Sequence, residues 1–334
     1  MNRPPAAAEG TRDGLGVAWA VRSAAFARWL ETPPAPVARP LGAGFEAEIE
    51  ALARPGAPGE PAFVLKRWRP GWAVDPGAQH AFLEHAARAG LPVAAPAGWG
   101  RTPDRRPVLA TAYAGAPAAT PAAGHLRRCA GVLRRIHATP LEAVGMGTGP
   151  DGPGPPPGPP GVEILGASFP GLEAQPDLRA ICLALRQRID AQPPALVHGD
   201  FNQGNILLRD GTLSVVDWTE ARAGDPRLDL AWAWMGLWIY AGEGAAATFL
   251  AGYLAGRPPA IDRAALGDFE ALAGLRWLLI RRLLLRRGRT LSAGGTSVGA
   301  IAALVEARLP PAWRGRLPEL GAGRGVPGAG IITP

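Results

Sequence analysis

Three polar side chains near the middle of the chain have the types and spacing needed to hold a cation beside a proton acceptor. Asn205, five positions after Asp200, comes directly before the apolar run 206–208, and Asp217 comes directly after the apolar run 213–216. An Arg-Asp-Gly-Thr turn separates the runs, so we expect them to pair as strands and to bring Asn205 and Asp217 side by side. Two converging oxygen ligands suit a hard cation whose remaining positions are filled by phosphate oxygens and water. Asp200 is then free to receive a hydroxyl proton.

The surrounding residues repeat a known pattern. The motifs HGDFNQGNILL at 198–208 and VVDWTEARAGDPRLDLA at 215–231 resemble the aminoglycoside phosphotransferase and choline kinase-like family. Protein kinases have a comparable order of a catalytic-loop Asp, an Asn five residues on and a metal-binding Asp after the next strands. Asp and Asn are also common in plain turns, but a turn does not explain the second motif in order and spacing.

The resemblance implies a two-lobed, protein-kinase-like α+β fold, with a small mixed β-sheet N-lobe and a larger, mainly helical C-lobe. A nucleotide is expected in the cleft between the lobes. The expected parts are an N-terminal extension with a helix at 1–37, a nucleotide-binding N-lobe at 38–112, a catalytic and substrate-binding C-lobe at 113–310 and a flexible tail at 311–334.

The implied reaction moves the γ-phosphate of ATP, or of GTP, to a hydroxyl of an aminoglycoside-, amino-alcohol- or sugar-like small molecule. In this interpretation Asn205 and Asp217 hold Mg²⁺, and Asp200 acts as the base. His198 is expected to brace the catalytic loop rather than to react. The residues do not indicate which acceptor is used.

Upstream features fit a nucleotide-binding lobe. Lys66, in the apolar run 63–68, is the only lysine among 35 Lys and Arg residues, and its compact ammonium can meet a phosphate as a point charge. The resemblance assigns it to the nucleotide phosphates, with a turn at Gly42 and Gly44 over them. It also places a linker that receives the adenine near Ala110 and Tyr113, although Tyr113 fits plain packing equally well.

One departure from the family concerns the partner of Lys66. Gln79 stands where we align the glutamate that usually pairs with the lysine, and Glu84 is the only acid on the predicted helix 76–90. Positions 79 and 84 lie on different helical faces. Either Glu84 reaches Lys66 after a local shift, or the pair is absent.

Four further polar residues are interpreted as scaffold. We expect Asp225 to hydrogen-bond the catalytic loop and Asp229 to cap the helix that follows. Glu220 and His137 are also expected to be structural, with a smaller chance that Glu220 touches the substrate.

The composition is that of a globular protein, with 47% hydrophobic and 19% charged residues and a net charge of +7. The basic residues are spread along the chain without regular aromatic interleaving, so we do not expect a nucleic-acid partner. The basic apolar helix Arg276–Arg289 could lie on an anionic membrane, but a packed helix with its arginines at the rim is favoured. Trp232, Trp234 and Trp238 fit the core better than a cofactor site, although they could wall a substrate cleft.

Cys129 and Cys182 match no zinc or CxxC spacing, which favours a reduced cytoplasm. No apolar secretory segment is visible near Met1. The longest apolar stretch, 230–242, is shorter than the ~20 residues that a membrane span requires, so no membrane partner is expected.

Two other classes of function stay open at this point. One is a non-catalytic nucleotide-binding module of the same fold, suggested by Gln79. The other is a basic surface-binding protein, which rests only on the overall charge and on the 276–289 helix. Local patterns further predict helices at 17–30, 76–90, 125–138 and 178–190, strands around 41–52, 62–68 and 106–115, and a low-complexity loop at 147–161.

Overall fold

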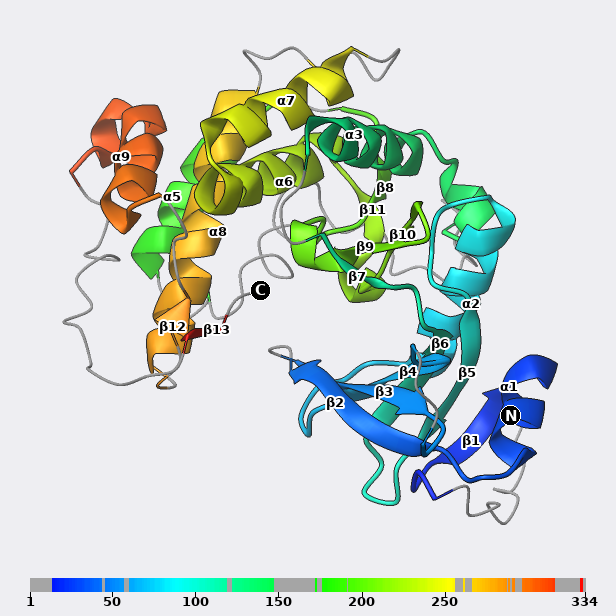
Figure 1. Cartoon of the computed structure of the whole chain (residues 1–334). Helices are drawn as coiled ribbons and strands as arrows, with labels where there is room; N and C mark the ends of the chain where they lie inside the picture. The colour runs from blue at the N-terminus through cyan, green and yellow to red at the C-terminus, as the bar shows by residue number, and fades with distance from the viewer. Residues whose placement is uncertain are drawn as a thin grey trace, which may run out of the picture. The chain divides into compact units, whose positions relative to one another are not determined.

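The computed structural model describes residues 14–43, 46–56, 60–118, 122–146, 172, 176–190, 192–255, 261, 266–286, 288, 290–291, 296–315 and 331–332. It divides into two compact units, and Figure 1 shows the elements of each. The first unit contains Met1–Gly115 and Arg209–Thr219, and the second contains Ala116–Leu208 and Glu220–Pro334. The predicted loop 147–161 and most of the predicted tail lie outside the described residues.

A six-stranded sheet is the centre of the first unit, in the order β1-β5-β6-β4-β3-β2, and all of its strand pairs are antiparallel. Two helices accompany it, α1 (Ala24–Glu31) and α2 (Pro76–Arg88). The core includes Phe26, Leu52, Leu65 and Val108, all fully buried. The strands are β1 (Ala18–Arg22), β2 (Val37–Ala43), β3 (Ala47–Ala53), β4 (Phe63–Trp68), β5 (Pro96–Arg101) and β6 (Pro107–Ala112).

The helix predicted over 17–30 is wrong in its first part. Residues Ala18–Arg22 form β1, which pairs with β5, and the helix begins only at Ala24. Ser23 separates the two elements because its hydroxyl accepts a hydrogen bond from the Phe26 N–H at 3.3 Å, which is a helix N-cap. Residues Ala18–Arg22 form an edge strand because their backbone pairs with β5, and helical periodicity in the sequence does not reveal this pairing.

Local signals place α2 correctly. Asp75 accepts hydrogen bonds from the first-turn N–H groups of Gly77 and Ala78, and Pro76 occupies the first helical turn. Gly90, with a φ of 76°, follows the helix end in the left-handed region that glycine tolerates. The helix therefore has a cap at its start and a glycine at its end, as its sequence predicts.

The segment Arg209–Thr219 carries Asp217 and is folded against α2 and its following loop. It contains β10 (Thr212–Val215) and the first residues of η4 (Trp218–Glu220). The Val215 N–H donates to the Pro92 carbonyl at 2.6 Å, and the Trp218 ring lies 5.4 Å from the Phe82 ring. Both contacts position Asp217 within the first unit.

The second unit is mainly helical. Short strands β7 and β9 pair antiparallel, as do β8 and β11, while β12 and β13 form a separate parallel pair. The helices are α3 (Ala123–His137), α5 (Pro176–Gln187), α6 (Pro226–Ala241), α7 (Glu243–Leu254), α8 (Gly267–Arg286) and α9 (Val298–Arg308), with short η1 (Leu141–Val144), η3 (Gln203–Asn205) and η6 (Pro311–Trp313). The strands are β7 (Ala116–Pro117), β8 (Ala195–Val197), β9 (Ile206–Arg209), β11 (Arg222–Gly224), β12 (Thr290–Leu291) and β13 (Ile331–Ile332).

The basic helix predicted at 276–289 is the second half of the longer α8. Residues Phe269–Leu279 of α8 are buried, Arg276 included, and the apolar ones except Gly274 belong to a core that α5, α6 and α9 share. Of the two interpretations, the structure contains the packed helix over Arg276–Leu279, and residues 280–285 are partly buried. Among the described residues, no helix is both long and apolar enough to cross a bilayer.

Gly274 permits close approach of α8 and α9. A Cβ added there would lie 2.6 Å from the Val305 side chain, whereas a Cβ added at Gly236 in α6 meets nothing within 4 Å. We expect Gly274→Ala to lower the free energy of unfolding by about 1–3 kcal/mol through overpacking. Gly236→Ala should leave it unchanged or raise it by up to about 1 kcal/mol, since alanine favours helix. Urea midpoints of the two variants check this, and equal midpoints would contradict the packing.

Candidate active site

Lys66 is the centre of a polar cluster in the first unit. Its Nζ donates to Glu46 Oε1 at 2.5 Å, to Asp217 Oδ1 at 2.6 Å and to Thr219 Oγ1 at 2.8 Å. It also lies 4.9 Å from the centre of the Trp68 ring. The strand β4 is paired on both edges, with β3 and β6, so the lysine projects from a fixed backbone.

The two carboxylates keep Lys66 charged although only 12% of its side chain is exposed. Burial alone would lower its pKa, but the nearby carboxylates of Asp217 and Glu46 outweigh burial, and the pKa lies above its usual value. Burial raises the pKa of Glu46, and repulsion from Asp217 adds to this, against the attraction of Lys66. The cluster thus presents a fixed ammonium with two acids in direct contact.

Glu46 is the acid that sequence reasoning missed. Glu84, the expected candidate, lies 4.0 Å from His80 and 3.7 Å from Arg88, and half of its side chain is exposed. The acidic partner of Lys66 therefore does not come from α2, where it was expected, but from the residue before β3. The signal that could have found Glu46 is the hairpin register, because β3, which starts directly after Glu46, pairs with the strand of Lys66.

Asp217 has a constrained backbone. Its φ of 63° lies in the left-handed region, which non-glycine residues visit mainly when Asn or Asp is involved. Its Oδ1 accepts from Thr219 at 2.9 Å as well as from Lys66. Hydrogen bonds from Lys66 and Thr219 to the same carboxylate oxygen therefore hold its direction.

Asp200 lies in the second unit, on the loop between β8 and η3. Its backbone carbonyl and its Oδ2 both accept from Asn205 Nδ2 at 2.9 Å. Because Asn205 turns its Nδ2 toward Asp200, its Oδ1 is the atom left for another partner, such as a cation. Asp200 Oδ1 accepts from the Trp232 indole at 2.8 Å.

The backbone of the loop that carries Asp200 is held by Asp229. Its two oxygens accept from the N–H groups of His198 at 2.5 Å and Gly199 at 2.8 Å, and His137 Nε2 lies 3.3 Å away. Gly199 has a φ of 85°, and a Cβ there would lie 2.6 Å from Glu220. This position therefore requires glycine.

The expected roles of Asp225 and Asp229 are exchanged. Asp225 is the N-cap of α6, since it accepts from the Arg227 N–H at 3.0 Å, whereas Asp229 bonds the loop. The reason is periodicity: Asp229 is one helical turn into α6 and faces inward, where it is fully buried. His198 is fully buried, and its Nδ1 accepts from the Asp200 N–H at 3.2 Å.

The remaining predicted nucleotide contacts are dispersed over the first unit. Gly42 lies near the end of β2 beside a bulge at Pro40, and Gly44 lies outside the described residues. Ala110 is buried in β6. The Tyr113 N–H donates to the Ala62 carbonyl at 3.0 Å.

Asn205 belongs to the second unit and Asp217 to the first. Within the described residues, no three His, Cys, Asp or Glu side chains gather as a metal site. The donor chemistry of the pair nevertheless fits a hard cation, since both supply oxygen.

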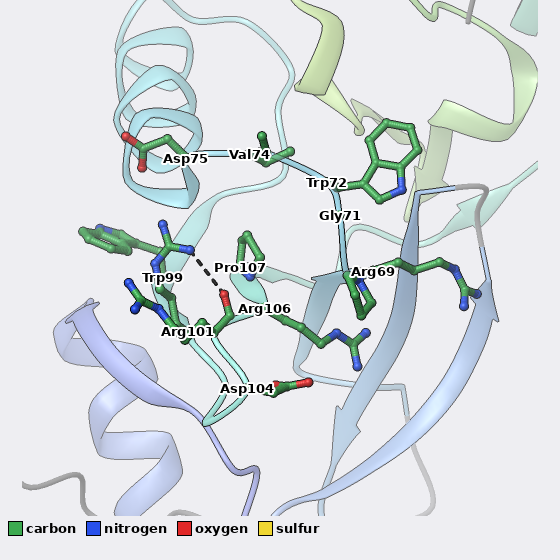
Figure 2. A pocket seen from close by; sticks show the side chains of 13 residues that line it. Arg69, Gly71, Trp72, Val74, Asp75, Trp99, Arg101, Asp104, Arg106 and Pro107 are labelled. Carbon is green, nitrogen blue, oxygen red and sulfur yellow. Dashed lines mark hydrogen bonds between the residues drawn. The ribbon is translucent and has the colours of Figure 1, made fainter. Parts of the chain in front are cut away.

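A separate cavity of about 700 Å³ opens in the first unit, and neither Lys66 nor Asp217 lines it. Figure 2 shows its walls, which come from the segment between β4 and α2 and from the β5–β6 hairpin. Four arginines face it, but Glu48 binds two of them, and Asp75 and Asp104 add negative charge. Its charges therefore nearly balance, and we assign it no part in the chemistry of the two clusters.

Comparison with known proteins identifies the class. The sequence pattern of the phosphotransferase enzyme family matches residues 37–269, which is most of the chain. The chain belongs to this family, whose members are small-molecule kinases. Among curated proteins, none matches the sequence.

Solved structures share the fold at low sequence identity. A thermostable mutant of the aminoglycoside phosphotransferase APH(4)-Ia is 18% identical, with 82% of this chain and 95% of that one covered, at a TM-score of 0.58. The amicoumacin kinase hAmiN, solved with AMP-PNP, Ca²⁺ and Ami, gives 15% identity, 81% and 86% coverage and a TM-score of 0.56. An ethanolamine kinase from Plasmodium vivax is 12% identical, with 85% of this chain and 84% of that one covered, at a TM-score of 0.52. The expected protein-kinase-like α+β fold is thereby confirmed.

Asp229 offers a test of how the loop is held. Burial alone would raise its pKa, but His137, His198 and the backbone hydrogen bond outweigh burial, and the pKa lies below the ordinary 3.8. A folded-state pKa below the unfolded one stabilises the fold at higher pH, and this stabilisation disappears as pH falls through the folded value.

We therefore expect Asp229→Asn to lower the free energy of unfolding by about 2 kcal/mol at pH 7, because charged hydrogen bonds are lost. The difference from the parent should shrink below pH 3.8. Asp75→Asn, at an exposed helix cap where Asn serves as well as Asp, is the matched control and should change little. Urea unfolding at several pH values measures both, and a difference that does not vary with pH would contradict this account.

Proposed function

We propose that the protein transfers the γ-phosphate of ATP, or of GTP, to a hydroxyl of a small molecule, with Asp200 as the base. The observation that supports this most directly is the contact of Asn205 with Asp200. The amide Nδ2 holds the carboxylate, and the amide oxygen stays available as a cation ligand. In a chain of the phosphotransferase family, this arrangement supports both roles proposed for the loop, the base and the cation ligand.

Each cluster has a proposed task. Lys66, with its charge maintained by two acids, binds the nucleotide phosphates, and Gly42, near the end of β2, lies over them. Asn205 Oδ1 and Asp217 would hold Mg²⁺, which neutralises charge on the β- and γ-phosphate oxygens. The segment Ala110–Tyr113 receives the adenine through backbone groups.

Asp200 orients the acceptor hydroxyl and takes its proton. A base needs a fixed position more than an unusual acidity for this task, because phosphoryl transfer depends mainly on positioning and electrostatic stabilisation. Here hydrogen bonds from Asn205 and Trp232 reach the two carboxylate oxygens from different sides. His198 supports the backbone of the same residue.

The acceptor is proposed at the level of its reacting group. The solved relatives are kinases of aminoglycosides, amicoumacin and ethanolamine by their names. For this chain we propose an aminoglycoside-, amino-alcohol- or sugar-like alcohol. The alternative of a non-catalytic module was suggested by Gln79, which stands where a glutamate would pair with Lys66. Glu46 supplies an acidic partner for Lys66 instead, which weakens the argument for that alternative.

The direct test measures transfer from γ-labelled ATP with Mg²⁺ to a panel of aminoglycosides, macrolides, amino alcohols and sugars. Asp200→Asn should lower kcat by about 10²–10⁴-fold, because proton transfer in the transition state is lost. The KM for ATP should stay near the parental value. Turnover retained in this variant would contradict the role of Asp200.

The partner of Lys66 provides a second test. Glu46→Gln removes one of the two acids that hold the ammonium, so we expect the KM for ATP to rise several-fold. Glu84→Gln is the matched control, since its contacts are His80 and Arg88, and it should leave the KM unchanged. Steady-state kinetics at varied ATP measures both. A larger effect at Glu84 would restore the helix-based pairing.

A further inference from the structure

The two oxygens of Asp200 are held by different parts of the second unit. Oδ2 accepts from Asn205, five residues along the same loop, and Oδ1 accepts from the Trp232 indole N–H at 2.8 Å. Trp232 lies on α6. A carboxylate fixed at both oxygens cannot rotate freely, so its remaining lone pairs point in set directions.

Arg276 of α8 supports the same arrangement from a third element. Its guanidinium carbon lies 4.2 Å from the centre of the Trp232 ring, a cation–π contact. Its Nη1 donates to the Gly199 carbonyl at 2.7 Å, and its Nη2 lies 3.9 Å from Asp200 Oδ1. Arg276 therefore contacts the indole and the loop backbone and lies close to the Asp200 carboxylate.

A buried guanidinium carries a desolvation cost of several kcal/mol unless it is well paired. Arg276 is 7% exposed, and Glu220 balances its charge at 3.1 Å. Packing of α8 alone would be served as well by an apolar residue. The contact of this charge with the loop that carries Asp200 therefore points to a role beyond packing.

The other tryptophans of α6 behave differently. Trp234 and Trp238 stack on one another, with ring centres 5.8 Å apart and planes at 9°. Like Trp232, they pack against the apolar core of the unit. Trp232 shares the helix with them but directs its N–H to Asp200, which separates its contact from ordinary core packing.

We propose that Trp232 and Arg276 are positioning residues for phosphoryl transfer. Trp232 fixes the direction of the Asp200 carboxylate through its N–H. Arg276 fixes the indole through its face and the loop through Gly199. This inference rests on the proposed function of Asp200 as the base. It adds two residues, from α6 and α8, that act on the reaction only through Asp200.

The first test compares Trp232→Phe with Trp234→Phe, an aromatic substitution two residues away on the same helix. Trp232→Phe keeps a ring beneath Arg276 but removes the N–H donor. We expect kcat to fall by about 10- to 100-fold, since a slightly misplaced base loses rate steeply. The KM for ATP and the thermal midpoint should stay near parental values. Trp234→Phe should leave kcat unchanged.

Arg276 is tested by two substitutions of different chemistry. Arg276→Met keeps much of the buried stem but removes the charge, and Arg276→Lys keeps the charge but cannot form the same fork of contacts. We expect kcat to fall in both, more strongly in Arg276→Met. Circular dichroism identifies a variant that fails to fold, and in that case the Trp232 pair of variants decides.

A spectroscopic readout tests the contact without turnover. In protein labelled with ¹⁵N-tryptophan, the indole resonance of Trp232 is identified by its loss in Trp232→Phe. Asp200→Asn should shift this resonance and leave that of Trp234 in place. An unshifted Trp232 resonance would overturn the contact.

The outcomes separate the two proposals. If the parental protein transfers phosphate and Trp232→Phe does so equally fast, the positioning role is wrong and the proposed function stands. If the parental protein transfers the γ-phosphate of ATP to none of the acceptors in the panel and not to water, the proposed function fails, and the positioning role fails with it. Reduced kcat with an unchanged KM and a shifted indole resonance supports both.

Discussion

A buried ammonium is stable only beside carboxylates, and in this protein that requirement organises the first unit. Lys66 comes from the middle of the sheet, Glu46 from the start of β3 and Asp217 from a segment far along the chain. The Asp217 segment is tied to the loop after α2 by a backbone hydrogen bond to Pro92, and to α2 itself by the Trp218–Phe82 ring contact. The ion pairs thus depend on a piece of chain that enters the first unit and leaves it again within Arg209–Thr219.

In the second unit a buried carboxylate, that of Asp229, likewise needs partners that offset its desolvation. Asp229 is isolated from water, and the N–H groups of His198 and Gly199 give it hydrogen-bond partners. Those N–H groups belong to the loop that presents Asp200. These hydrogen bonds therefore offset the desolvation cost of Asp229 and also fix the backbone next to Asp200, the residue proposed as the base. Gly199 is needed because both the conformation and the space exclude a side chain.

Sequence reasoning succeeded where the signal was local and failed where it was not. The cap and stop residues of α2, and the apolar runs that became β9 and β10, lie within a few positions of the elements that they define. Only the first part of the helix predicted over 17–30 is wrong, because β1 is decided by pairing with β5, almost eighty residues away, whereas the second part is the helix α1. Glu46, Trp232 and Arg276 were missed or taken as packing for the same reason, since their importance arises from contacts between distant elements.

The composition of the chain makes Lys66 chemically distinct from every other side chain. Arginine replaces lysine at every other basic position, so this chain has one side-chain amine, and that amine is enclosed by two acids. Acylating or aldehyde reagents that spare guanidinium groups would meet a single internal target. Its rate of modification would report how often the Glu46 and Asp217 contacts open, which makes the residue a built-in probe of motion in the first unit.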